Sequence, residues 1–118
     1  MQEQAGAACL SYGPSVVELT GTLIRKTFAD ATGRPETYWV LNLSHPACVN
    51  EDPKDSDLSY AQKDVRAVQL VLLDHKMYVT YKDLIGKKVI AKGTLFAGIT
   101  AHHHTPLLLN LSTVRAAN

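Results

Sequence analysis

The sequence lacks most features that dictate a chemical reaction or a membrane location. It contains no G-x-S-x-G, H-E-x-x-H or G-x-x-x-x-G-K-S/T motif, which would indicate an activated nucleophile, a metalloprotease helix or a phosphate-binding loop. The 12 Lys and Arg nearly balance the 11 Asp and Glu, and a formal net charge of +1 gives no overall attraction for nucleic acid or anionic membranes. The longest apolar run, residues 65–73, is far shorter than the roughly 20 residues of a membrane helix. We therefore expect a non-catalytic protein without membrane insertion.

Cysteine is scarce, and the two copies, Cys9 and Cys48, indicate where the protein resides. An even pair in a small domain, without metal-ligand spacing, is typical of a disulfide, which persists only in an oxidising compartment. The alternative is two separate buried thiols in a cytosolic protein. The disulfide interpretation predicts a periplasmic or secreted protein. Because the first residues have neither the basic start nor the apolar stretch of a signal peptide, we expect the mature form after signal-peptide removal.

The pattern of apolar residues predicts a single β-rich domain over residues 1–118. Asp74 is placed to cap a short helix that Gly86 ends. One helix between strands three and four of five is the order of an OB-like Greek-key barrel, so we expect a mostly β fold of that kind. Five segments have the alternation or β-branched composition of strands: 16–26, 37–43, 65–72, 88–96 and 106–114.

Two segments are expected to lie outside these strands. Residues 1–14 form an N-terminal arm, which the disulfide would tie to the segment after the second strand. Residues 44–64 are rich in Pro, Asp, Glu, Asn and Ser, so we expect a surface excursion with a short helical turn at 58–63.

The most unusual run is His102, His103 and His104, followed by Thr105, in the loop before the last strand. OB-folds often bind ligands through this loop. In an extended run His102 and His104 point the same way, which makes them candidate ligands for zinc, copper or nickel. The alternative is that the imidazoles hydrogen-bond to the backbone and to neighbouring side chains and rigidify the loop.

A basic cluster at Arg25, Lys26 and Arg34 lies around the turn after the first strand. Together with nearby aromatic residues it is a candidate site for an oligonucleotide or oligosaccharide. Trp39, however, alternates in phase with Leu41, so we expect it in the core. The aromatic residues in question are Phe28, Tyr38, Trp39 and Phe96.

Several short motifs taken together resemble one known family. They are Cys9–Tyr12, the strand at 17–23, Glu36–Leu41, Pro46–Val49, Val68–Val71, Gly93–Phe96 and His102–Pro106. The series is similar to a bacterial exported family known as domain of unknown function 4431. The resemblance implies a secreted or periplasmic domain with a small β-barrel, in which Cys9 and Cys48 match the family's cysteine pair and 102–105 match its histidine motif. It implies no established activity. We expect no cofactor, unless the histidines bind zinc, copper or nickel.

These observations lead to one functional prediction and two alternatives. We expect a non-catalytic exported module that binds a partner protein in the cell envelope, as an inhibitor or immunity factor would. The binding candidates are the residues around Arg25 to Arg34 and the loop 97–105. Transition-metal binding at His102 and His104 is the first alternative, and oligonucleotide or oligosaccharide binding is the second.

Overall fold

The computed structural model describes residues 2–3 and 8–117. Most of the chain is β-strand, with one short α-helix near the middle. The elements are β1 (Gln2–Glu3), β2 (Leu10–Ser11), β3 (Val16–Ala29), β4 (Pro35–Asn50), β5 (Gln62–Val71), the helix α1 (His75–Tyr81), the 3-10 helix η1 (Lys82–Leu84), β6 (Lys88–Ala97) and β7 (Leu107–Ala116).

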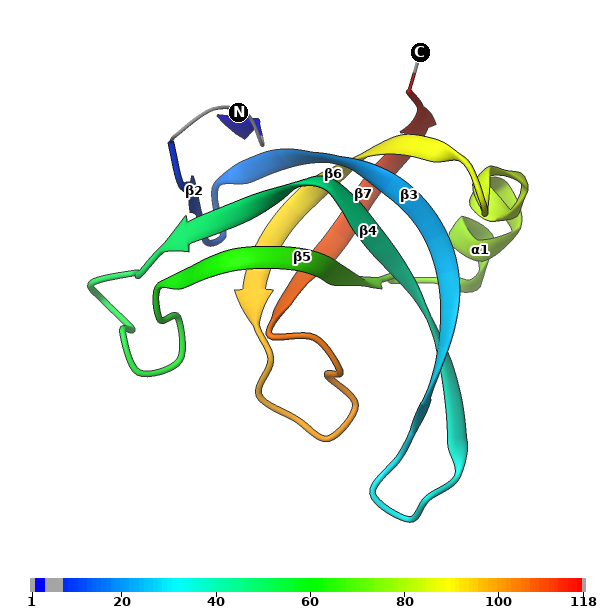
Figure 1. Cartoon of the computed structure of the whole chain (residues 1–118), viewed down its shortest axis with the longest axis horizontal. Helices are drawn as coiled ribbons and strands as arrows, with labels where there is room; N and C mark the ends of the chain where they lie inside the picture. Colours follow the sequence, from blue (N-terminus) through cyan, green and yellow to red (C-terminus); the bar gives the residue numbers. More distant parts are fainter. Residues whose placement is uncertain (1, 4–7, 118) are drawn as a thin grey trace.

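Five long strands are joined in a closed ring (Figure 1). β3 pairs with β4 and with β6, β4 with β5, and β6 with β7, all antiparallel. A parallel pairing of β5 with β7 completes the ring. The short strands β1 and β2 add parallel pairings to β3 and β4. The prediction of a mostly β fold with one short helix between the third and fourth of five main strands is confirmed.

The core fills the inside of this ring. The alternation expected in the first strand is present in β3, where every second residue faces the core and Val17, Leu19 and Leu23 are completely buried. Trp39 is 6% exposed and belongs to the same cluster, as its phase predicted. Two glycines allow neighbouring strands to touch, since a Cβ at Gly93 would lie 2.0 Å from the Asn110 carbonyl oxygen and one at Gly21 2.2 Å from that of Asn42.

The polar segment 44–64 is a correction to the sequence analysis. β4 continues to Asn50 and β5 begins at Gln62, so only 51–61 leaves the sheet. Ala47 and Val49 are buried while their neighbours face outward, and register shifts accommodate Pro46. The helical turn expected at 58–63 is wrong, because residues 53–58 form turns and 62–63 already belong to β5.

The predicted disulfide between Cys9 and Cys48 is present, with a sulfur–sulfur distance of 2.03 Å. It joins the segment before β2 to β4, beside the pairing of Leu10 with Val49. Of the N-terminal arm predicted over 1–14, residues 1 and 4–7 lie outside the described part. The expected helix cap is also present, since an Asp74 Oδ1 atom accepts a hydrogen bond from the Met77 amide at 3.1 Å. Within the described residues, no helix has the length and apolarity needed to cross a membrane.

Candidate functional site

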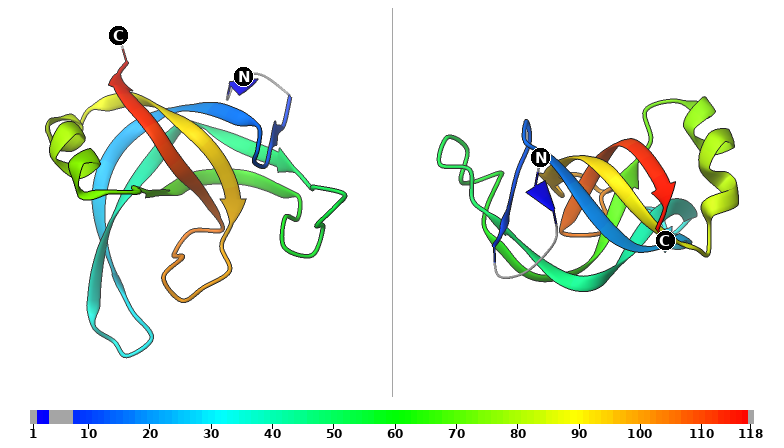
Figure 2. Two further views of the ribbon diagram at one scale, coloured as in Figure 1. Left: turned by 180° about the vertical axis from the view of Figure 1, so that it is seen from behind. Right: turned by 90° about the horizontal axis from the view of Figure 1, so that it is seen from above.

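The β3–β4 hairpin extends well beyond the core at one end of the ring. Its two strands stay paired as far as Ala29 opposite Pro35. The turn between them is held by an Asp30 Oδ1 atom, which accepts hydrogen bonds from the amides of Thr32 and Arg34, each at 2.8 Å. Figures 1 and 2 show that this hairpin projects on the same side of the molecule as the loop between β6 and β7. We call that loop, residues 98–106, the histidine loop.

His103 belongs to the internal structure of the histidine loop. Its Nδ1 atom accepts hydrogen bonds from the amides of Ile99 at 3.0 Å and Thr100 at 3.3 Å. Its ring packs edge-on against Phe96, with centroids 5.3 Å apart. Burial lowers the pKa of His103 below its ordinary value, and the two accepted bonds require an unprotonated Nδ1. His103 therefore acts as scaffold, as the second interpretation of the histidine run expected.

Gln69 fastens the histidine loop to β5. It is 2% exposed, and its side chain accepts from the His104 amide at 2.8 Å and donates to the His102 carbonyl at 3.0 Å. Its own amide donates to the Thr105 hydroxyl at 2.9 Å. Thr105, predicted as a binding residue, is thus engaged in holding the loop.

Two apolar residues outside the main core cluster are also buried. Val40 and Leu108 are 1% and 0% exposed, yet neither belongs to the main core cluster. They flank Gln69, which pairs with Val40 on β4 and with Leu108 on β7. Leu108 lies close to the histidine loop, since a Cβ added at Gly98 would be 3.5 Å from its Cδ1 atom.

The hairpin and the histidine loop meet at Glu36. Its carboxylate lies 3.0 Å from His102 Nδ1 and accepts a hydrogen bond from the Tyr38 hydroxyl. The Tyr38 and His102 bonds hold the pKa of Glu36 below its ordinary value. In return, the Glu36 carboxylate raises the pKa of His102 and raises that of Tyr38 to about 12. The contact is charge-assisted when His102 is protonated, and the His102 side chain remains 69% exposed.

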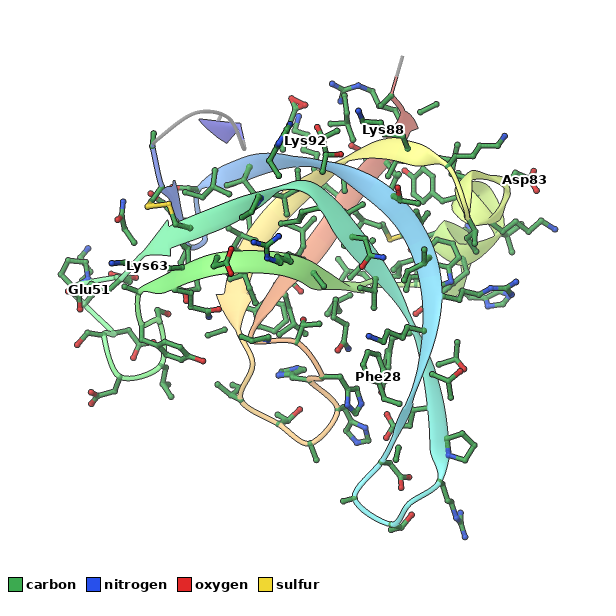
Figure 3. The ribbon with its side chains drawn as sticks, viewed as in Figure 1. Phe28, Glu51, Lys63, Asp83, Lys88 and Lys92 are labelled. Carbon is green, nitrogen blue, oxygen red and sulfur yellow. A yellow bond between two sulfur atoms is a disulfide. The ribbon has the colours of Figure 1, made fainter. Side chains whose placement is uncertain are left out.

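His104 lies beneath this contact and is largely enclosed. Its ring stacks on Phe28 with centroids 4.3 Å apart and planes 4° from parallel, and Figure 3 shows Phe28 on the hairpin next to the loop. Its Nε2 atom is 3.6 Å from a Glu36 oxygen and is buried without a hydrogen-bond partner. His104 therefore contributes mainly by stacking.

The structure brings His102 and His104 together at Glu36 and leaves the predicted basic residues on the surface of the hairpin. Arg25, Lys26 and Arg34 are exposed on the hairpin, and the Lys26 ammonium lies 5.5 Å from the centre of the Phe28 ring. Sequence reasoning named Glu36 only within a family motif and not as a site residue. A signal was available, because Glu36 stands opposite Phe28 in the hairpin and alternates in phase with Tyr38.

His102 and His104 both approach Glu36, as their expected common orientation requires. Even so, in residues 2–3 and 8–117 no group of three or more His, Cys, Asp or Glu side chains is arranged to hold a metal ion. The aromatic platform is also reduced, because Trp39 is buried and the Phe28 ring is stacked against His104.

Fold and site together define a small β domain that closes as a ring and contains one disulfide. Its β3–β4 hairpin and its histidine loop are joined by the contact between Glu36 and His102. The model of a family described as "Domain of unknown function (DUF4431)" matches residues 67–115, which confirms the resemblance to that family over those residues. The match includes Gln69 and the whole histidine loop, whereas Glu36 and both cysteines lie before it. No curated protein matches the chain.

Proposed function

We propose that this chain is a non-catalytic, exported bacterial module that binds a partner protein through the surface formed by the β3–β4 hairpin and the histidine loop. The observation that carries the proposal is the contact between Glu36 and His102, two residues 66 positions apart. Because this contact and the bonds of Gln69 hold both segments in place, their surface is organised before a partner arrives. Such preorganisation reduces the ordering cost of binding.

The architecture that we propose for this module is the OB-fold. Around the ring the order β6-β3-β4-β5 is that of a Greek key, in which the fourth strand returns to lie beside the first. The hairpin between the first two main strands and the loop between the last two are those through which OB-folds bind their ligands.

The disulfide supports the proposed location. A cross-link between Cys9 and Cys48 persists in the periplasm or outside the cell, where small domains gain stability from it. A domain of this kind, without recognisable catalytic motifs, is suited to a role as an inhibitor or immunity factor in the envelope.

The composition of the surface favours a protein over a polyanion. Arg25, Lys26 and Arg34 share the hairpin with Asp30 and Glu36, so both signs of charge are present. A nucleic-acid track requires a consistently positive groove and exposed rings for stacking. Mixed charge around a fixed loop is typical of the polar rim of a protein interface.

A matched pair of histidine variants tests the proposal. The wild-type protein, with its disulfide intact, is used for affinity capture from an envelope extract, and the captured partner is purified for calorimetry. We expect His102→Ala to weaken binding by about tenfold or more, because it removes an exposed side chain and releases Glu36. His75→Ala, an exposed histidine on α1, should leave the affinity unchanged. Equal affinities for the two variants, or no partner above an empty column, would contradict the proposal.

The same protein tests the metal alternative. Thermal unfolding is followed with zinc, copper and nickel, since an ion that binds only the folded state raises the midpoint. A shift that His102→Ala abolishes would favour metal binding, whereas an unchanged midpoint at millimolar metal would remove that alternative.

A further inference from the structure

The ring of strands is weakest between β5 and β7. Their parallel pairing covers only Gln69 to Val71, at the end of β5. In the described part of the chain, no strand pairs with the preceding residues of β5 on that side. The edge of β5 over 62–68 therefore faces the end of the histidine loop instead of a neighbouring strand.

A groove lies along this open edge. It has a volume of about 500 Å³ and is lined by residues 60–67 on one side and 104–106 on the other. One end is bounded by the bond from the Gln69 amide to Thr105, and the other by the bond from Gln62 Nε2 to the Pro106 carbonyl at 2.9 Å. Figure 3 shows Lys63 at the start of β5, far from Phe28 on the hairpin. The groove is thus a second feature next to the proposed surface, and it shares only residues 104–106 with it.

The backbone of β5 directs hydrogen-bonding groups into the groove. The Gln69 amide points to this side, because it donates to Thr105. Backbone groups alternate between the two sides of a strand, so the N–H and C=O of Ala67 face the groove as well. Before Ala67 the pairing of β5 with β4 becomes irregular, with register shifts between Ala67 and Val65 and again between Val65 and Gln62.

The bulge between Gln62 and Val65 contains a residue in a backbone conformation that residues other than glycine rarely adopt. Asp64 has a φ of 53°, the only positive φ of a non-glycine residue in the described part. Three steps along β5, from Gln62 to Val65, oppose two along β4, from Ala47 to Val49. Bulges end regular pairing and are frequent next to functional sites. Here the two register shifts leave only the residues just before Gln69 in regular pairing with β4.

The lining specifies the side chains that fit. Ala61, Val65, Ala67 and Pro106 provide apolar surface, and the charged lining residues are two cations and one anion, Lys63, Arg66 and Asp64. Asp64 is already paired with Arg66 at 2.9 Å. The groove therefore favours an extended peptide that carries apolar residues and a carboxylate.

We propose that this groove binds a short, acidic, extended segment of the partner protein, which adds to the open edge of β5 as an extra strand. Strand addition derives its affinity from main-chain hydrogen bonds and its specificity from alternate side chains. This inference rests on the proposed function, because it names the part of the partner that the module recognises.

The probe is an acetylated and amidated pentapeptide, Val-Glu-Val-Thr-Val, titrated into isotope-labelled protein and followed by NMR. Two further versions carry backbone N-methyl groups on residues 2 and 4, or on residues 1, 3 and 5. In an added strand only alternate amides face β5, so one methylation pattern should weaken binding by about tenfold or more and the other should not. The Ala67 amide should shift, and its hydrogen exchange should slow at saturating peptide.

Protein variants complete the test. Ala67→Pro removes the donor at a position where an open edge tolerates proline, and Ala67→Ser keeps the donor at similar size. We expect only the proline variant to lose the peptide. Any of three results would overturn the inference: no binding at millimolar peptide, equal effects of the two methylation patterns, or a dimer that occupies this edge. If the wild-type protein fails to bind the peptide while partner capture still depends on His102, the groove inference is overturned and the proposed function remains intact.

Discussion

Removal of the disulfide provides the most quantitative test of the structure. The perturbation is the double substitution Cys9→Ala and Cys48→Ala. Both cysteines are only partly buried, so the substitutions remove the cross-link without opening a large cavity. The remaining ties of this segment to the ring include the β2 pairing of Leu10 with Val49, the bond from the Tyr12 hydroxyl to the Tyr60 carbonyl at 2.6 Å and the bond from the Gly13 amide to the Leu95 carbonyl at 3.0 Å.

The magnitude follows from the loop that the bond closes. For a sequence separation of 39 residues, the chain-entropy argument gives about 13 cal/mol/K, or about 4 kcal/mol at 25 °C. An unfolding entropy of about 2.1 cal/mol/K per residue amounts to roughly 250 cal/mol/K for 118 residues. The expected loss therefore corresponds to a decrease of about 16 °C in Tm.

The assay is thermal and urea unfolding of the wild type and the double variant, with and without reductant. Reduced wild type should unfold at the same temperature as the variant, and the variant should not respond to reductant. Hydrogen exchange should increase more at Leu10 and Val49 than in β6 and β7. A decrease of less than about 5 °C would refute the reasoning, because it would show that the cross-link restricts the unfolded chain far less than the loop length requires.

Four further predictions concern the site and the ring. Gln69→Leu removes both side-chain bonds to the histidine loop and should lower the free energy of unfolding by about 2 kcal/mol in urea, and an unchanged value would contradict the role of Gln69. Gly93→Ala places a methyl group 2.0 Å from the Asn110 oxygen and should cost about 3 kcal/mol in the same assay, so a neutral effect would show that the strands are not in this close contact. In NMR titrations His103 should have a pKa below the ordinary 6.5 and His102 one above it, and the reverse order would exclude the described environments. The lowered pKa of Glu36 gives stability that is lost as the pH falls through it, and the raised pKa of His102 gives stability that is lost as the pH rises through it. The destabilisation by Glu36→Gln should therefore be greatest between pH 4.5 and 6.5, and a flat difference would contradict the ion pair.

The strands and the disulfide could be predicted from local patterns. Alternation at Val17, Leu19 and Leu23 predicts which face of β3 is buried, because successive side chains of a strand point to opposite sides. An even pair of cysteines in a small domain likewise predicts a disulfide, even when the distance between the two residues in the fold is unknown.

Elements with mixed environments were harder to predict. The sequence of the end of β4 resembles that of a loop, because its outward residues are polar and it contains Pro46. Ala47 and Val49 are nevertheless buried. Val40 and Leu108 are out of phase with the core and are nevertheless buried. Alternation alone does not predict burial on the outer face of a sheet, because that burial depends on what the rest of the chain places there.

The sequence by itself determined the composition of the site: a histidine run next to the last strand, a hairpin with a basic cluster, and two cysteines for a cross-link. Only the tertiary structure decided how the three histidines divide, with His102 exposed at Glu36, His103 bonded inside the loop and His104 stacked on Phe28. The physical reason is that adjacent residues with the same side chain differ only in what surrounds them. For His102 and His104 those surroundings come from β3 and β4, more than 60 residues earlier in the chain, whereas His103 is held by residues of its own loop and by Phe96.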